Sequence, residues 1–422
     1  MMKRIKKLGA AICALLCTVS ALPRAAVSAA DAVAISVLAL GDETLLAEEG
    51  ETAAAELVAD YYHGTATNDA AADMTSSDLV RLLKNDSDIQ ADVADADVIL
   101  VSVGYQDLMN VVFYENPYYT NAAACTTFLG LMQASSSSVA LQMIEYVIDA
   151  LPDVVETINA NLEKTISLIR EQNDSAEIVI QCVQNPIAVN TTTLLEQGLS
   201  ESRVTATQEL RNFLDVCMQG GSYTSSYYTL KTLTISTGIN QSIADISDAH
   251  TADFYSEFYG TSDASALGFY LTNLENLRMT YTPVGQVVLA AAVVTASDVL
   301  TCGDGSVLTA AYADTGEQTT LLQMQASLDS LIQTAGTAVY QERILGDIDA
   351  DGTVSIQDAS MALLEYANQA AGNGSSFHVL ERRAADIKHD HTVTIQDAAL
   401  ILRYYADLAA GVDTSWDTLL TS

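Results

Sequence analysis

A twelve-residue pattern occurs twice near the end of this 422-residue chain, and it restricts the local fold more than any other feature. The first copy runs from Asp347 to Asp358 and the second from Asp386 to Asp397. An apolar pattern with helical spacing follows each copy, at 359–368 and at 398–408. We therefore predict that residues 343–415 form a small all-α region built from two loop-and-helix repeats.

The first copy has the oxygen ligands of a calcium-binding loop at positions 1, 3, 5, 7, 9 and 12, and Gly352 supplies the sharp turn at position 6. The predicted ligands are Asp347, Asp349, Asp351, Thr353 (through its carbonyl oxygen), Ser355 and Asp358. Calcium takes about six to eight hard oxygen ligands on a pliable loop. The sequence therefore predicts one tight calcium site, and calcium binding should be coupled to folding because the carboxylates repel one another without the metal.

The second copy departs from this pattern at two positions. Lys388 replaces the oxygen ligand at position 3, and His391 replaces the turn glycine. The remaining candidate ligands are Asp386, Asp390, Thr392 and Asp397. Because a lysine removes one ligand and repels a cation, we predict that the second site is weaker or empty.

The repeated unit resembles a type I dockerin, the module that attaches cellulosomal proteins to cohesin domains of a scaffoldin. The resemblance covers residues 343–413 and implies that loop positions 10 and 11 contact the cohesin. These positions hold Ile356, Gln357, Ile395 and Gln396. The identical pairs suit binding in either of two related orientations. Tyr366 and Tyr404 either extend this surface or pack the two helices together.

Residues 33–297 alternate short apolar runs with helical patterns. The predicted strands are 33–40, 97–103, 176–183 and 230–236, and the predicted helices are 52–62, 76–84, 138–172 with a break at Pro152, 200–217 and 284–296. Such alternation predicts an α/β fold, with a parallel sheet covered on both faces and chemistry at the carboxyl ends of its strands. Residues 298–342 are predicted to be a connector with one amphipathic helix at 321–332.

Four stretches of the larger segment, 34–43, 68–79, 98–107 and 280–290, resemble in order and spacing the conserved blocks of SGNH (GDSL-type) hydrolases. The resemblance implies a three-layer α/β/α, flavodoxin-like domain over residues 30–297. At the positions of the family's nucleophile, its two oxyanion donors and its base, this chain has Glu43, Asp73, Gln106 and Thr280. Ester hydrolysis needs an activated nucleophile, a base and oxyanion donors. We therefore predict a pseudoenzyme with no catalytic residues and with a binding or structural role.

Carboxylates are concentrated where the resemblance places the active site. Asp42, Glu43, Asp73 and Asp107 are expected near the strand ends. They form either a pocket for a cation or for sugar hydroxyl groups, or a solvated surface left after catalysis was lost, and we favour the second reading. The rival function is a plant cell-wall polysaccharide-degrading hydrolase, an esterase or glycosidase that uses these carboxylates.

The amino terminus has the pattern of a signal peptide, predicted to be residues 1–29. Lys3, Arg4, Lys6 and Lys7 precede an apolar run, 8–22, which is too short to span a bilayer. Removal of residues 1–29 leaves 13 of the 18 Lys and Arg residues against 54 Asp and Glu residues, a net charge of −41. A surface of this charge excludes nucleic acid as a partner.

We expect a secreted protein, extracellular or held at the cell surface through a scaffold. Its expected partners are a cohesin and, as a candidate ligand, polysaccharide, and no later segment has the apolar length of a membrane span. Cys125, Cys182, Cys217 and Cys302 lack the spacing of a zinc site. They are read as packed thiols, with one disulfide left open.

Overall fold

The computed structural model describes residues 32–118, 125, 127–133, 140–185, 187–225, 231–259, 266–273 and 280–421. The predicted signal peptide therefore lies outside the described residues. The chain divides into two compact units. One is Ala34–Gln341, here the α/β unit, and the other joins the described residues 32–33 to 342–421, here the carboxyl-terminal unit.

A five-stranded parallel sheet lies at the centre of the α/β unit, in the order β2-β1-β3-β4-β7. Its strands are β1 (Ser36–Gly41), β2 (Thr65–Asn68), β3 (Val98–Ser102), β4 (Glu177–Gln181) and β7 (His250–Ala252). All five residues of β3 are buried, as are nearly all those of β1 and β4. Strands covered on both faces have such continuous apolar runs. The predicted α/β class with a parallel sheet is confirmed.

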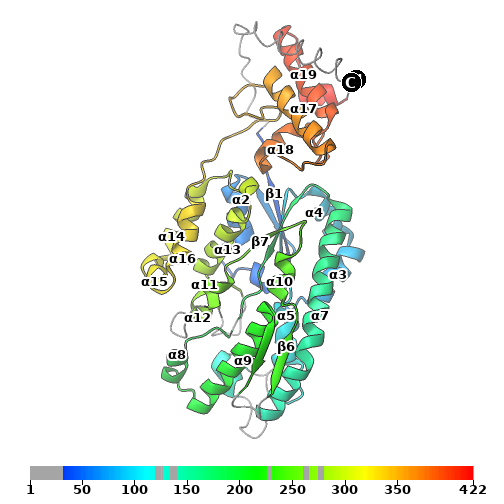
Figure 1. Ribbon diagram of the computed structural model, residues 1–422. Helices are drawn as coiled ribbons and strands as arrows, with labels where there is room; N and C mark the ends of the chain where they lie inside the picture. Colours follow the sequence, from blue (N-terminus) through cyan, green and yellow to red (C-terminus); the bar gives the residue numbers. More distant parts are fainter. Residues whose placement is uncertain are drawn as a thin grey trace. The chain divides into compact units, whose positions relative to one another are not determined.

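Helices lie on both sides of this sheet (Figure 1). The helices of this unit up to residue 295 are η2 (Glu43–Leu45), α2 (Ala54–Tyr61), α3 (Ser76–Asn85), α4 (Ser87–Asp95), α5 (Tyr105–Met109), η3 (Asn110–Tyr114), α6 (Phe128–Gln133), α7 (Ala140–Gln172), α8 (Thr191–Glu196), α9 (Glu201–Gln219), α10 (Ile239–Ala244), α11 (Tyr255–Tyr259), α12 (Gly268–Leu271) and α13 (Pro283–Thr295). Helices α2 and α13 cover one face, and α3, α4 and α7 lie on the other. Helix α13 is buried along nearly its whole length, which explains why its sequence is apolar on every side.

The predicted strand at 230–236 forms, but not in the parallel sheet. It is β6 (Thr232–Ile235), which pairs antiparallel with β5 (Gly221–Thr224) in a separate two-stranded sheet. Only Leu233 and Ile235 of β6 are buried. An alternating pattern of this kind belongs to a half-exposed antiparallel strand, so the placement in the parallel sheet was wrong.

Helix α7 continues through Pro152, so the predicted break there is wrong. Pro152 is exposed, while Leu151, Val155 and Ile158 are buried on the inner side of the helix. A proline removes one main-chain hydrogen bond of a helix. The apolar contacts on both sides of Pro152 outweigh this loss and keep one continuous helix of 33 residues.

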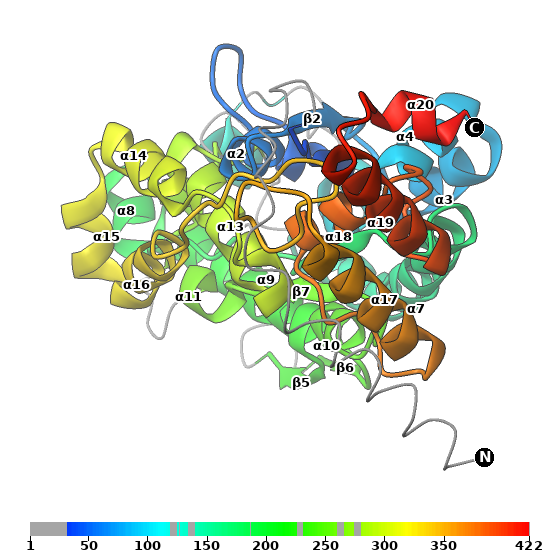
Figure 2. The ribbon, with the colours of Figure 1, turned by 90° about the horizontal axis from the view of Figure 1, so that it is seen from above.

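Residues 298–341, expected as a connector, are helical and belong to the α/β unit. They form η7 (Asp298–Leu300), α14 (Gly305–Thr315), α15 (Gln318–Met324) and α16 (Ala326–Ala335). Helices α14 and α16 pack against α13, and Figure 2 shows the group beside it. The single helix predicted at 321–332 is therefore parts of two helices, because the non-helical Gln325 (φ −144°, ψ 86°) separates them.

The carboxyl-terminal unit consists of α17 (Ile356–Ala370), α18 (Val379–Ala385), α19 (Ile395–Ala409) and α20 (Trp416–Leu420). Helices α17 and α19 pack side by side (Figure 2). The Trp416 ring stacks on Tyr404 with 4.0 Å between centroids. Tyr404 is therefore part of the internal packing, whereas Tyr366 is 37% exposed.

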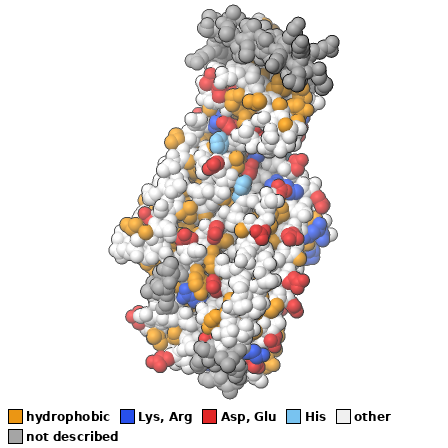
Figure 3. Space-filling view, viewed as in Figure 1, with side chains coloured by type: hydrophobic (Ala, Val, Ile, Leu, Met, Phe, Trp, Pro, Cys, Tyr) orange, Lys and Arg blue, Asp and Glu red, His pale blue; other side chains and the backbone are white. Residues whose placement is uncertain are grey.

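Among the described helices, none is both long and apolar enough to cross a bilayer. Cys182 and Cys217 are buried thiols that form no disulfide within the described part of the chain. Acidic side chains outnumber basic ones on the face of the molecule seen in Figure 3, in line with the net charge of −36 for the whole chain.

Candidate functional site

Three of the carboxylates predicted to bind calcium lie together in the first loop. Asp347, Asp349 and Asp351 each place an oxygen within 4.8 Å of the others. Main-chain amides hold Asp347 in place, because Asp351 donates to its Oδ1 at 3.2 Å and Gly352 donates to its Oδ2 at 2.9 Å. Gly352 has φ +83°, a left-handed conformation that favours glycine.

Asp358, the predicted ligand at position 12, is fully buried at the start of α17. Its Oδ1 accepts the main-chain N–H of Ile348 at 2.8 Å, and its Oδ2 accepts the N–H and hydroxyl of Ser355, both at 2.8 Å. Asp358 thus closes the loop on itself, while Ser355 caps α17. The structure brings Asp358 close to the group of three but does not place it within that group.

The donor set of the first loop fits calcium. Its side-chain donors are all carboxylate or hydroxyl oxygens, and Thr353 donates its hydroxyl to Asp351 at 2.5 Å. Burial, and to a smaller extent the charges of Asp358 and Asp349, raise the pKa of Asp347 to about 6. A divalent cation at this position would neutralise carboxylates that otherwise repel one another.

The second loop has the same main-chain closure but a different charge at its centre. Asp386 accepts N–H groups from Asp390 at 3.2 Å and from His391 at 2.8 Å, as Asp347 does in the first loop. His391 adopts φ +61° where the first copy has glycine. The Lys388 ammonium nitrogen lies 2.5 Å from Oδ2 of Asp390. Thr392 donates its hydroxyl to Oδ1 of Asp390 at 2.7 Å, and Oδ1 of Asp397 accepts the N–H of Ile387 at 3.1 Å.

The four predicted partner-binding residues differ in exposure. Ile395 is 55% exposed and Gln396 is exposed, whereas Ile356 is half-buried. Gln357 is exposed and donates its side-chain amide to Oδ2 of Asp349 at 2.8 Å. This bond joins a predicted partner-binding residue directly to a predicted calcium ligand.

In the α/β unit, Asp42 is fully buried where β1 ends. Gly41 precedes it with φ +137°, and a Cβ there would lie 1.8 Å from the Ser102 carbonyl oxygen, so only glycine fits. Oδ1 of Asp42 accepts hydroxyls from Thr44 at 2.6 Å and from Ser102 at 3.1 Å. Burial is the main reason that the pKa of Asp42 rises to about 6. Its other oxygen, Oδ2, has no hydrogen-bond partner among the described residues.

Of the four positions aligned with the SGNH machinery, Glu43 and Asp73 lie near the same side chain. Burial raises the pKa of the Tyr114 hydroxyl, and the charges of Glu43 and then Asp73 add to the shift. Asp73 is exposed and holds φ +61°, a left-handed conformation that side chains other than glycine seldom adopt. Asp107 accepts the N–H and hydroxyl of Ser76 at 2.8 Å and so anchors the start of α3.

The other two aligned positions are buried and have hydrogen-bond partners of their own. Gln106 donates its side-chain amide to Asn110 at 2.8 Å. Thr280 donates its hydroxyl to Glu48 at 2.7 Å and accepts the Asn273 amide at 3.0 Å. Neither residue has an acid–base group of the kind that activates a hydroxyl nucleophile.

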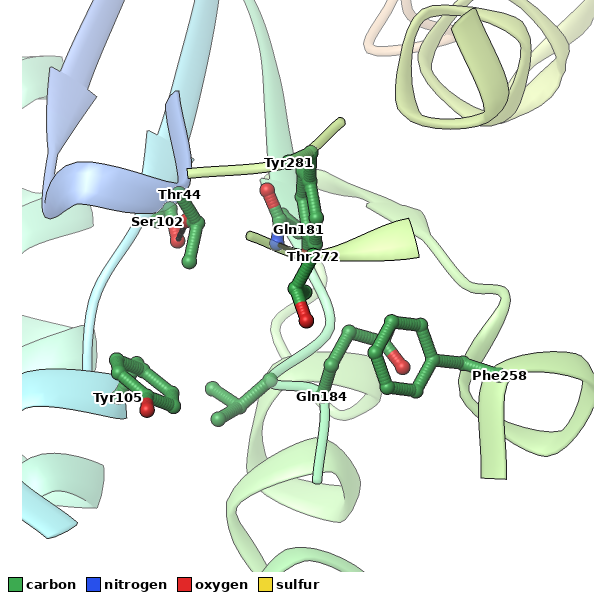
Figure 4. A pocket seen from close by; sticks show the side chains of 9 residues that line it. Thr44, Ser102, Tyr105, Gln181, Gln184, Phe258, Thr272 and Tyr281 are labelled. Carbon is green, nitrogen blue, oxygen red and sulfur yellow. Dashed lines mark hydrogen bonds between the residues drawn. The ribbon is translucent and has the colours of Figure 1, made fainter. Parts of the chain in front are cut away.

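A small, partly open pocket, with room inside for about one water molecule, lies beside Asp42 at the ends of β3 and β4 (Figure 4). It is lined by Thr44, Ser102, Tyr105, Gln181, Val183, Gln184, Phe258, Thr272 and Tyr281. The Tyr105 hydroxyl and the Oε1 atoms of Gln181 and Gln184 are buried without a hydrogen-bond partner in the described structure. Sequence comparison with the SGNH blocks missed these residues. Gln181 lies near the carboxyl end of the predicted strand 176–183 and Gln184 directly follows it, where ligands of such sheets lie.

Among the described residues, no histidine lines this pocket. His250 lies 3.0 Å from Glu177 at the other end of β4, and His63 lies 3.4 Å from Asp304. Both imidazoles are thus engaged elsewhere. The pocket offers hydroxyl and amide groups and the nearby Asp42 carboxylate, and it has no imidazole base.

No family model and no curated protein sequence matches the chain. Similar solved structures include a lipase from a goat rumen metagenome, with 13% identity and a TM-score of 0.37. The phospholipase A1 of Streptomyces albidoflavus NA297 has 16% identity and the extracellular lipase of Streptomyces rimosus 14%, both with a TM-score of 0.36. The matches cover 59–61% of this chain and 92–95% of those proteins. TM-scores this low do not assign a family.

Proposed function

We propose that the carboxyl-terminal unit is a calcium-dependent docking module of the type I dockerin kind, and that it attaches a secreted protein to a cohesin domain of a scaffoldin. One observation carries this proposal: Asp347, Asp349 and Asp351 converge on a loop that leads directly into α17. The same loop-and-helix unit is repeated at α19. The protein is then extracellular, or held at the cell surface through the scaffold.

Exposed apolar side chains on both helices of the module support a docking role. They are Leu363, Leu364 and Tyr366 on α17, and Ile395 and Leu402 on α19. Hydrophobic side chains gather on the visible face of this unit in Figure 3. Because calcium ligands occupy the loop before α17, calcium binding would fix the start of the helix that presents three of these residues.

The experiment that tests this function removes two ligands. Asp347→Ala combined with Asp358→Ala should abolish tight calcium binding and unfold the first loop, as measured by calorimetric titration of the full chain. Asp413→Ala, an exposed carboxylate of the same unit, is the control and should leave calcium binding unchanged. Unchanged calcium stoichiometry in the double variant would rule out the proposed ligands.

For the α/β unit, we propose an SGNH-like pseudoenzyme with a binding or structural role, polysaccharide being the candidate ligand. The absence of an imidazole from the lining of the pocket and the hydrogen-bonded states of Gln106 and Thr280 support this proposal. The purified protein should bind polysaccharide in a sedimentation assay without releasing sugar or acetate. Release of either product would contradict the pseudoenzyme proposal.

One observation favours a second candidate, the polysaccharide-degrading hydrolase that uses non-standard carboxylates. Asp42 has a pKa of about 6 and accepts the hydroxyl of Thr44, which lines the pocket. A carboxylate with a raised pKa beside a hydroxyl group resembles a base beside a nucleophile. Assays on aryl acetates and acetylated xylan distinguish the two functions. Activity that is lost in Glu43→Ala or Thr44→Val would favour the hydrolase, and activity absent in the unsubstituted protein would exclude it for these substrates.

A further inference from the structure

The second loop contains a cation of its own at the position where the first loop gathers carboxylates. The Lys388 ammonium lies 2.5 Å from Oδ2 of Asp390, and its charge also interacts with Asp397 and Asp386. Arg383, at the end of α18, places a second cationic nitrogen 3.8 Å from Oδ2 of Asp386. The acidic side chains of this loop therefore already face positive charge.

The main chain of the second loop is closed in the same way as that of the first. In both, the aspartate at position 1 accepts two N–H groups from the turn, at 3.2 and 2.9 Å in the first loop and at 3.2 and 2.8 Å in the second. In both, the aspartate at position 12 accepts the N–H that follows position 1, at 2.8 Å from Ile348 and 3.1 Å from Ile387. The loop shape is thus kept although one ligand has become a lysine.

The two loops differ in what remains for a metal ion. Among the described residues, a group of three acidic side chains with converging oxygens forms in the first loop alone. In the second loop, one oxygen of Asp390 contacts Lys388 and the other accepts the Thr392 hydroxyl. Calcium needs about six to eight oxygen ligands, and a lysine at position 3 removes one and repels the ion.

We propose that Lys388 is a tethered cation that takes the place of calcium in the second loop, so that the module binds a single calcium ion. The single calcium ion in the first loop rests on the proposed function, whereas the exclusion of calcium from the second loop does not. The sequence alone left the second site either weak or empty, and this inference states that it is empty. The Lys388 ammonium neutralises acidic side chains of the second loop, and the loop does not bind calcium.

The test counts the calcium ions bound to the full chain by native mass spectrometry. The unsubstituted protein should bind one ion. Lys388→Asp restores a carboxylate at position 3 and should raise the number to two. Lys84→Asp, which makes the same charge change at an exposed position of α3, should leave it at one. Asp386→Asn, in the second loop, should also leave it at one.

The outcomes separate this inference from the proposed function. Two ions on the unsubstituted protein would overturn the role of Lys388 and leave the docking proposal intact. No bound ion would overturn the docking proposal itself. A Lys388→Asp variant that folds and still binds one ion would show that Lys388 is not what excludes calcium. If that variant does not fold, the count for the unsubstituted protein and for Asp386→Asn still decides the question.

Discussion

Asp42 combines complete burial with an oxygen, Oδ2, that has no hydrogen-bond partner among the described residues. Burial disfavours the charged form of a carboxyl group, so the pKa rises from 3.8 to about 6. The folded chain therefore holds this proton more tightly than the unfolded chain does. Ionisation of Asp42 then reduces stability as the pH rises between these two values.

Asp42→Asn should raise the free energy of unfolding at neutral pH by about 1–3 kcal/mol. Asparagine keeps an oxygen that accepts the Thr44 hydroxyl and removes the buried charge. The gain should disappear as the pH falls below the unfolded pKa of 3.8, where Asp42 is protonated in both states. Urea denaturation across this pH range measures it, with the exposed Asp60→Asn as control. A variant less stable than the unsubstituted protein at neutral pH would contradict the assignment of Asp42 as a buried, destabilising charge.

At the level of single residues, the sequence predicted the metal ligands better than the pocket. The ligands of the first loop are close in sequence, so their spacing alone brings Asp347, Asp349 and Asp351 together. The pocket joins residues from three strand ends, from α11 and from the segment before α13, and only tertiary structure brings these together. Sequence blocks drew attention to Gln106, which is hydrogen-bonded elsewhere, and away from its neighbour Tyr105, which lines the pocket.

At the level of elements, α7 shows how packing overrides a local signal. Its main chain lacks one hydrogen bond at Pro152, whose side chain is exposed. Pro152→Ala restores the N–H group without removing a buried contact. We expect it to raise the free energy of unfolding by about 1–3 kcal/mol. The greater conformational entropy of the unfolded chain without proline offsets part of this gain.

Urea denaturation of the Pro152 variant measures this gain. Asp153→Ala, an exposed substitution one residue further along the same helix, should change stability by no more than about 0.5 kcal/mol. A loss of stability in Pro152→Ala would mean that the ring of Pro152 itself supports the helix.

In the parallel sheet, strands were predicted where burial is continuous and missed where it is not. The central strands β1, β3 and β4 were each found from an apolar run. The edge strand β2 has four residues, none of them buried, and β7 has three, of which one is buried. Their pairing depends on neighbouring strands rather than on their own sequence. The alternating burial of β6 was the one available signal that it does not belong to the parallel sheet.

At the level of the whole molecule, the carboxyl-terminal unit is closed by contacts between its beginning and its end. Gly346 has φ +86°, and a Cβ there would lie 2.6 Å from the Trp416 ring, which also stacks on Tyr404. Trp416 is the only tryptophan in the chain, so its fluorescence reports on this unit. The sequence left open whether Tyr404 packs the helices or contacts a partner, and its burial assigns it to packing.

Tyr404→Ala should therefore lower the free energy of unfolding of this unit by about 3 kcal/mol, as followed by Trp416 fluorescence in calcium. Tyr366→Ala is the matched control, because Tyr366 is 37% exposed, and it should cost less than about 1 kcal/mol. Equal losses in the two variants would contradict the division between a packing tyrosine and a surface tyrosine.

The most direct test of the account is the binding of the full chain to immobilised type I cohesin domains, measured by surface plasmon resonance first in millimolar calcium and then in excess chelator. We predict saturable binding to at least one cohesin in calcium, and its loss in chelator, because the loop that begins α17 opens when its carboxylates lose their ion. Binding that persists unchanged in chelator would contradict the account, as would a module that is folded and calcium-loaded but binds none of the cohesins.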